Sequence, residues 1–121
     1  MTKLTQAFKA LGDKKRVQML GLLFKYREFC VCDFEKMLKI SQSQASRHLQ
    51  VLQRAGLITG RKQATWLYYR RTETPERMVA LLKTLRPVIE GAFPENLDKN
   101  AKQWLATKPK DVCKFGTPSG R

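Results

Sequence analysis

Apolar residues recur at three- and four-residue intervals through the first forty positions, which predicts a series of short amphipathic helices. The first such stripe stops at Gly12, so a helix is expected over residues 3–11. Asp13 is a candidate N-cap for a second helix that continues to about Tyr26. A third and shorter helix is predicted over residues 31–38. The first forty residues are therefore predicted to be helical throughout.

The next helix is predicted from Gln42 to about Ala55 and differs from the others in its outer face. Ser41 is a candidate N-cap, and Gln44, three residues later, can complete a capping box. Only a turn of about three residues separates this helix from the preceding one. Two helices joined so closely, the second with a polar face, are typical of a helix-turn-helix.

The polar face of this helix is chemically suited to reading DNA. At about 100° per residue, Arg47 points directly away from the stripe of Ala45, Leu49 and Leu52. Arginine can bond guanine through two hydrogen bonds, and glutamine can do the same with adenine. An ordinary solvated face has a similar composition, so this helix does not decide the function alone. The candidate DNA-binding residues of this region are Gln42, Ser43, Gln44, Ser46, Arg47, His48, Gln50 and Arg54.

After Gly56 the pattern changes to the alternation of β-strands. Residues 57–59 are expected to begin one strand, and residues 65–71 to form its hairpin partner. The basic corner between them would be the tip of a wing that contacts phosphates or the minor groove. The candidate DNA-binding residues of this corner are Arg61, Lys62 and Gln63.

The second half of the chain predicts two more helices. Pro75 is a favourable first helical position, and Pro87 is expected to kink or end that helix near Arg86. Its apolar stripe is longer than the rest of so small a domain is expected to bury. Together with the stripe of the first helix it is a candidate dimer seam, although both stripes could instead pack inside one monomer. A last amphipathic helix is expected around residues 97–105.

Composition and net charge favour a protein that binds nucleic acid. The 121 residues carry 24 Lys and Arg against 10 Asp and Glu, a formal charge of +14, which favours nucleic acid as a partner. Residues 1–107 are expected to form one domain and residues 108–121 a mobile basic tail. No apolar run is long enough for a membrane span and no signal-peptide core is present, so a soluble cytoplasmic protein without membrane contact is expected. No phosphate loop or paired-carboxylate motif is present, so neither an enzyme nor an organic substrate is expected.

Cys30 and Cys32 are the candidate sensing residues. At the start of a helix both sulfurs can face one ion, the helix terminus favours the thiolate, and thiolates select soft, thiophilic ions. Free cysteines are also often inert buried residues, and that alternative stays open. Tetrahedral zinc would need two further ligands, and the only histidine, His48, lies on the flank of the DNA helix. No structural metal is therefore expected.

Three segments together resemble the ArsR/SmtB family of metalloregulatory repressors, in its arsenic- and antimony-responsive branch. They are EFCVCDF at 28–34, SQSQASRHL at 41–49 and the wing from Arg61 to Arg70, and the resemblance covers roughly residues 4–89. It implies a mainly α fold with a small β-hairpin, that is, a homodimeric winged helix-turn-helix. It also implies repression of a resistance operon by binding operator DNA, with release when trivalent arsenic or antimony, As(III) or Sb(III), binds as inducer.

The resemblance assigns Cys30 and Cys32 as metalloid ligands. Some members of the branch have a third cysteine three residues after the second, where this chain has Glu35. Cys113 is the other thiol and the candidate third ligand, from either subunit. A site of two thiols would better suit a monomethylated arsenical. The family usually has Gly at the wing turn, where this chain has Ala64, so the tip is expected to differ in shape.

Two alternative functions remain open at this point. One is a thiol-redox repressor in which Cys30 or Cys32 pairs with Cys113. The other is a constitutive DNA-binding protein whose cysteines are inert. A response to peroxide that dithiothreitol reverses would favour the first alternative, and insensitivity to both peroxide and arsenite would favour the second.

Overall fold

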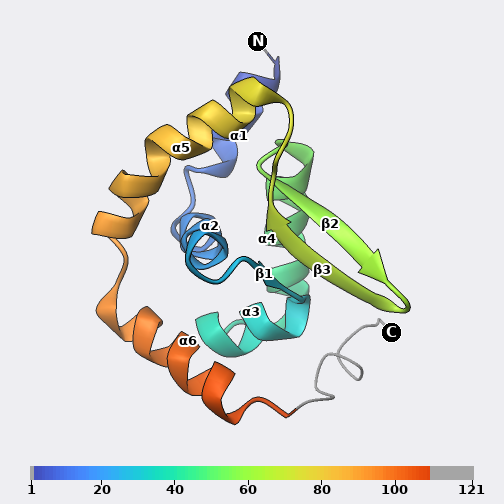
Figure 1. Cartoon of the computed structure of the whole chain (residues 1–121), viewed down its shortest axis with the longest axis vertical. Helices are drawn as coiled ribbons and strands as arrows, with labels where there is room; N and C mark the ends of the chain where they lie inside the picture. The colour runs from blue at the N-terminus through green and yellow to red at the C-terminus, as the bar shows by residue number, and fades with distance from the viewer. Residues whose placement is uncertain (1, 110–121) are drawn as a thin grey trace.

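A computed structural model describes residues 2–109, which form six helices and a three-stranded antiparallel sheet (Figure 1). The predicted class, helices with a small β-hairpin, is confirmed. None of the described helices is long and apolar enough to span a membrane. The elements are α1 (Thr2–Ala10), α2 (Lys14–Tyr26), β1 (Glu28–Phe29), α3 (Val31–Leu38), α4 (Gln42–Arg54), β2 (Ile58–Gln63), β3 (Trp66–Arg71), α5 (Glu76–Gly91) and α6 (Glu95–Thr107).

Helix α2 passes through the middle of the molecule, and the other elements surround it (Figure 1). Met19, Leu20 and Leu23 are fully buried on it. The predicted N-cap at Asp13 is confirmed, because its carboxylate accepts the backbone N–H of Lys15 at 2.9 Å. Burial raises the pKa of this carboxyl, but backbone hydrogen bonds and the charge of Arg16 outweigh that effect, and the net pKa is lowered.

Helices α3 and α4 pack together and form the predicted helix-turn-helix. Lys39 ends α3 in the left-handed conformation, with φ 57°. The capping box at Ser41 is confirmed. The Ser41 hydroxyl accepts the N–H of Gln44 at 3.1 Å, and the Gln44 side-chain oxygen accepts the N–H of Ser41 at 3.1 Å.

The sheet contains one strand that the sequence pattern did not predict. Its order is β1-β3-β2, with Glu28 opposite Arg70 and Phe29 opposite Tyr69. A two-residue strand is too short to show an alternating pattern, so periodicity could not reveal it. Its effect is to fix the chain immediately before α3 against the base of the hairpin.

Two local predictions were wrong. The hairpin tip is Ala64 and Thr65, because strand pairing continues to Gln63 opposite Trp66, and the basic corner at 61–63 therefore lies within β2. Ala64 occupies the tip with φ 57°. Helix α5 also does not end near Arg86, one of the two outcomes expected of Pro87, but continues through Pro87 to Gly91. We attribute this continuity to the buried side chains that hold α5 on either side of the hydrogen bond that proline cannot make.

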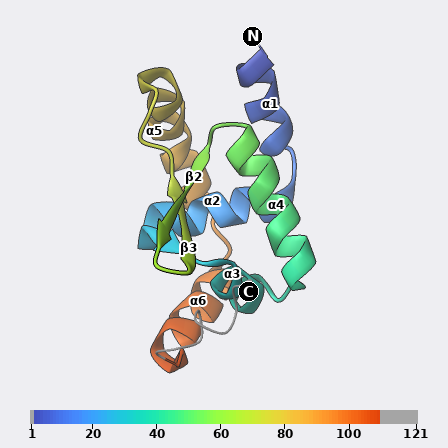
Figure 2. The same ribbon diagram turned by 90° about the vertical axis from the view of Figure 1, so that its right-hand side faces the viewer.

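The apolar stripes of α1 and α5 are only partly used within the subunit. Met78, Leu82 and Ile89 of α5 are buried. Phe8 of α1 and Val88 of α5 remain 57% and 68% exposed, respectively. Helix α1 and the start of α5 lie at the same end of the molecule in both views (Figures 1 and 2). Helix α6 lies at the other end, where it packs on α3.

Candidate functional site

The two cysteines of the CVC motif converge at the start of α3. Cys30 is the N-cap residue and Cys32 lies in the first turn, and both side chains are buried. Their Sγ atoms are 2.8 Å apart. The irregular backbone at the helix start thus turns both sulfurs toward one point, as predicted for a shared site.

Asp33 completes the cluster and was missed as a site residue. Its side chain is only 1% exposed. Oδ2 accepts the backbone N–H of Cys30 at 2.9 Å and lies 3.3 Å from Cys30 Sγ. One ligand atom from each of these three residues lies within 4.8 Å of the others. The sequence did offer one signal for Asp33. It stands three positions after the N-cap Cys30, where an acidic side chain can complete a capping box.

The C-terminal end of α6 supplies two further contacts to Asp33, from Trp104 and from Lys108, the residue that follows the helix. Trp104 Nε1 donates to Asp33 Oδ1 at 2.8 Å, and Lys108 Nζ lies 2.7 Å from the same oxygen. The carboxylate therefore joins the start of α3 to the end of α6. This link connects residues 71 positions apart in the chain, and no local sequence pattern could predict it.

The protonation of Cys32 differs from the expectation. Burial, reinforced by the negative charge of Asp33, raises the pKa of the Cys32 thiol to about 11. The expected preference for thiolate at the helix terminus is therefore wrong for Cys32, because desolvation outweighs the helix dipole. A ligand that binds this sulfur at neutral pH must displace a proton from it.

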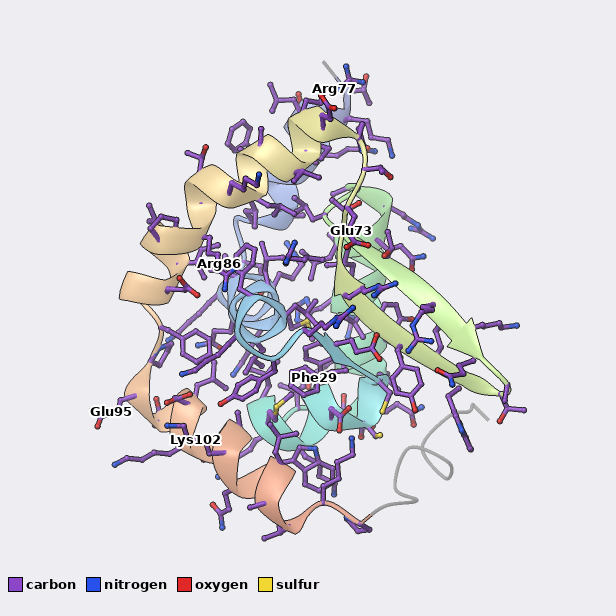
Figure 3. All side chains as sticks on the ribbon, viewed as in Figure 1. Phe29, Glu73, Arg77, Arg86, Glu95 and Lys102 are labelled. Atoms are coloured by element: carbon purple, nitrogen blue, oxygen red, sulfur yellow. The ribbon has the colours of Figure 1, made fainter. Side chains whose placement is uncertain are left out.

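The cysteines also contact the wing. Tyr68 of β3 packs against both of them. The guanidinium of Arg61 lies 5.3 Å from the Tyr68 ring centroid, and its Nη2 pairs with Glu28 Oε2 at 2.7 Å. Behind the pair, Phe29 lies between α2 and α3 and stacks edge-on against Phe34 (Figure 3). Arg61, predicted to contact phosphate, is thus half-buried in an internal ion pair.

The polar face of α4 is open to solvent. Gln42, Ser43, Arg47 and Gln50 are exposed and, with the half-buried Ser46, line a shallow hollow on the surface. We refer to these five residues as the reading face, after the DNA-binding role predicted for them. The predicted candidate Gln44 is exposed beside it, but the capping box already occupies its side-chain oxygen.

The remaining predicted DNA-binding residues lie around this face. His48 is half-buried, with Nδ1 3.3 Å from Arg16 Nη1, and burial lowers its pKa. Arg54 is exposed at the end of α4, and Lys62 is exposed on β2. Gln63 is exposed and accepts a hydrogen bond from Arg61 at 2.7 Å. Cys113 and most of the predicted tail lie outside the described residues.

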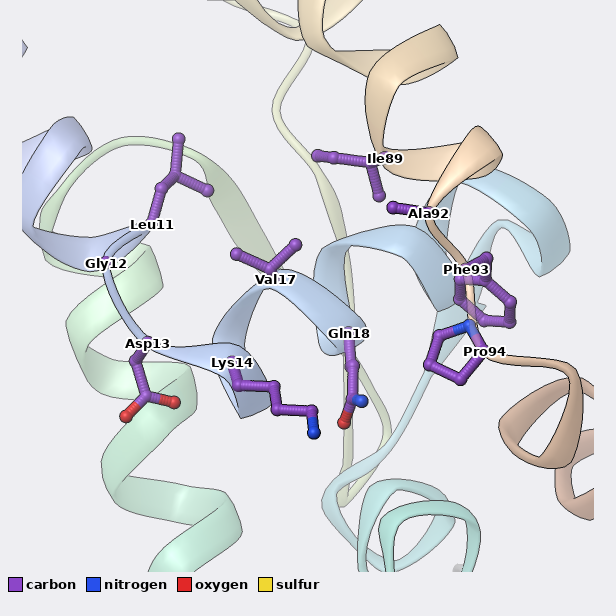
Figure 4. A pocket seen from close by; sticks show the side chains of 10 residues that line it. All are labelled: Leu11, Gly12, Asp13, Lys14, Val17, Gln18, Ile89, Ala92, Phe93 and Pro94. Carbon is purple, nitrogen blue, oxygen red and sulfur yellow. The ribbon is translucent and has the colours of Figure 1, made fainter.

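A separate cavity of about 340 Å³ lies between the start of α2 and the junction of α5 with α6 (Figure 4). Leu11, Val17, Ile89 and Phe93 give it an apolar lining. It shares no residue with the cysteine cluster or with the reading face. Its volume is within the range of small-molecule sites, but its lining offers few polar groups that converge on a ligand.

Comparison with known proteins decides the family. Residues 13–59 match the model described as "Bacterial regulatory protein, arsR family". Over 82 residues the chain is 39% identical to the "Putative arsenical resistance operon repressor ArsR2" of Halobacterium salinarum, covering 67% of this chain and 69% of that protein. The chain belongs to the ArsR family. This is a family of DNA-binding transcriptional regulators rather than of enzymes.

Two further comparisons extend the match beyond residues 13–59. It is 40% identical over 77 residues to the "Arsenic resistance transcriptional regulator ArsR1" of Pseudomonas putida, covering 63% of this chain and 60% of that protein. The match thus spans less than two thirds of that relative. A solved "homodimeric winged helix-turn-helix DNA-binding domain" of Mycobacterium bovis matches with a TM-score of 0.62 and 27% identity, covering 77% of this chain and 83% of that one. The winged helix-turn-helix predicted for this chain is confirmed.

Proposed function

We propose that this protein is a homodimeric repressor that binds operator DNA and releases it when trivalent arsenic or antimony binds Cys30 and Cys32. One observation carries the proposal. Two buried sulfurs lie 2.8 Å apart at the start of α3, the helix that packs directly on the helix bearing the reading face. The similarity to arsenical-resistance repressors supports the same choice of inducer.

DNA binding is assigned to α4 and the hairpin. The reading face enters the major groove, where Arg47 and Gln50 contact base edges. Lys62 and Arg54 contact phosphates, which hold the protein in register without reading sequence. The net charge of +14 makes the affinity strongly dependent on salt, because each phosphate contact releases condensed counterions.

Dimerisation is assigned to the apolar surface that the subunit leaves uncovered. Leu4 and Phe8 of α1 and Val88 of α5 are large apolar side chains between 43% and 68% exposed. Burying them against a second copy removes this surface from water and sets two reading faces for successive major grooves, about 34–36 Å apart. The homodimeric M. bovis structure supports this assembly.

Coupling between the inducer and DNA runs through α3. This helix has eight residues and is about 12 Å long, so a change in its first turn acts close to its contacts with α4. Inducer binding replaces the thiol protons with bonds to one atom, which alters the first turn and its contact with Tyr68. The reading face and the wing then shift together. A coupling free energy of about 1–3 kcal/mol is the usual size of such an effect.

The test uses a DNA duplex that the full-length protein selects from a random pool, with release followed by fluorescence anisotropy. Arsenite and antimonite are expected to release the wild-type protein. The double variant C30S/C32S is expected to bind the duplex with unchanged affinity and to stay bound in arsenite. Release of the double variant by arsenite would contradict the proposal. The variant C113S measures whether the third predicted ligand takes part.

The thiol-redox repressor remains a second candidate, supported by the position of Lys108. Its ammonium lies 2.7 Å from Asp33, so the side chain of Lys108, five residues before Cys113, reaches the buried cluster. Five residues span up to about 17 Å, enough for Cys113 to reach the pair in its own subunit. Release by peroxide that dithiothreitol reverses, without release by arsenite, would favour this candidate.

A further inference from the structure

Asp33 is a buried carboxylate whose chemistry the proposed cysteine site does not use. Both of its oxygens face polar atoms: Oδ1 meets the donors of Trp104 and Lys108, and Oδ2 meets the backbone N–H and the sulfur of Cys30. A charged group excluded from water is held there only by such partners. A reaction at the Cys30 sulfur therefore also changes the surroundings of Asp33.

Arsenite in neutral water is As(OH)3. When two reduced cysteines bind it, two S–As bonds form and two As–O bonds break. Each thiol proton leaves with one hydroxyl as water, so two waters are released and arsenic stays trivalent. The product keeps one As–OH group. Methylarsenite, CH3As(OH)2, loses both of its hydroxyls in the same reaction and keeps only its methyl group.

We propose that Asp33 Oδ2 accepts a hydrogen bond from the hydroxyl that remains on the bound arsenic, so that the site selects hydroxylated over methylated trivalent arsenic. This inference rests on the proposed function. Cys30 Sγ lies 3.3 Å from Oδ2, a distance at which a reduced thiol can donate to that oxygen, and formation of the S–As bond removes that donor. The As–OH group supplies a replacement at nearly the same place, because one ligand atom from each residue of the cluster lies within 4.8 Å of the others.

The methylated ligand offers no replacement donor. Its methyl group would stand where the hydroxyl of the arsenite product stands and could donate no hydrogen bond to the buried carboxylate, so the methylated product forgoes one charge-assisted hydrogen bond. Sites built to bond a hydroxyl reject analogues that lack it much more strongly than apolar pockets reject a missing methylene. This reasoning reverses the expectation, drawn from the number of thiols, that a site of two sulfurs suits a methylated arsenical.

Trp104 and Lys108 act as positioning residues in this scheme. Their donors hold Oδ1, which keeps Oδ2 turned toward the sulfurs. Lys108 also supplies the opposite charge that the buried carboxylate needs. Helix α6, which packs on α3, thereby belongs to the inducer site although it contributes no sulfur within the described residues.

The test measures the concentrations of arsenite and methylarsenite that release half of the selected duplex. All variants carry C113S, so that no third sulfur can displace the hydroxyl. The parent is expected to respond to lower arsenite than methylarsenite. Asp33→Asn is expected to raise the arsenite requirement about tenfold, the effect of one hydrogen bond to a charged group, while methylarsenite changes less than about twofold. Glu35→Gln is the matched control on the same helix and should change neither.

Trp104→Phe keeps the inference testable if Asp33→Asn does not fold. It preserves an aromatic ring and removes only the N–H donor, and it should raise the arsenite requirement in the same direction by a smaller factor. Circular dichroism and DNA affinity without inducer establish that each variant is folded. A W66F background leaves Trp104 as the only tryptophan, so its fluorescence reports inducer binding independently of DNA.

Two results would overturn the inference while leaving the proposed function intact. One is loss of arsenite release in C113S itself, which would mean that sulfur occupies the third position. The other is an equal loss of response to arsenite and methylarsenite in Asp33→Asn, which would make Asp33 a purely structural cap. Failure of the proposed function looks different, because the wild-type protein would then respond to neither arsenical.

Discussion

The cysteine cluster and the reading face lie on adjacent helices but are built in opposite ways. At the cluster, Cys30, Cys32 and Asp33 are at most 5% exposed, and neighbours on α6, β3 and their own helix fix each group. On the reading face, Arg47 and Gln50 are exposed. The backbone of α4 sets the direction of these side chains, and few contacts set their positions.

Under the proposed function, this difference separates two ways of recognising a ligand. A buried cluster is complete before its ligand arrives and tolerates little change, so selectivity there comes from the groups already in place. An exposed face gains its partners only in the complex and pays an ordering entropy for each side chain it fixes. The two regions should therefore respond differently to mutation, and the following predictions test that difference in decreasing order of effect.

The largest effect is expected for Phe34→Ala, in the core beneath the cysteine cluster. Phe34 is fully buried and stacks on Phe29, so truncation should lower the free energy of unfolding by about 3–5 kcal/mol. Urea denaturation followed by circular dichroism measures this change. The matched control is Gln50→Ala on the reading face, which should stay within about 0.5 kcal/mol of wild type. Similar losses in both variants would remove the contrast between the regions.

An intermediate effect, on DNA binding alone, is expected for Arg47→Ala. Loss of a bidentate base contact should weaken binding to the selected duplex by about 1–3 kcal/mol, with the free energy of unfolding unchanged. Anisotropy titrations at fixed salt measure it. Arg77→Ala removes an equal charge from the exposed start of α5 (Figure 3) and serves as the control. If the two variants lose the same affinity, Arg47 acts only through its charge.

The smallest effect is expected at the hairpin tip. Ala64 has φ 57°, a conformation that is strained for alanine and free of strain for glycine. Ala64→Gly should therefore raise the free energy of unfolding by about 0.5 kcal/mol once the greater entropy of unfolded glycine is subtracted. Ala80→Gly, the same change in the exposed interior of α5, should instead lower it by about 1 kcal/mol. Thermal unfolding of both variants distinguishes the two outcomes.

Periodicity and capping patterns were enough to predict the helices and the helix-turn-helix. Asp13 and Ser41 mark true helix starts because their side chains bond nearby backbone groups, a local effect that the sequence records directly. The cysteine pair was found for a similar reason, because two residues of one short motif must lie close together. Interactions between residues close in the sequence can therefore be predicted from the sequence alone.

The features that were missed depend on contacts between distant segments. Strand β1 exists because Phe29 pairs with Tyr69, and the Asp33 carboxylate is linked to the end of α6 because Trp104 and Lys108 reach it from there. The continuation of α5 through Pro87 likewise depends on tertiary packing rather than on helix propensity. Such pairings leave no signature within any one window of sequence.

The brevity of β1 has a consequence for moving the CVC motif into another protein. Phe29 is paired with the wing strand and buried in the core, and Cys30 follows it with no intervening residue. One inserted residue would either break that pairing or carry the first sulfur away from the second. Moved into another winged helix, the CVC motif would therefore bring its two sulfurs together only where a strand of the same length holds the preceding residue in the same register.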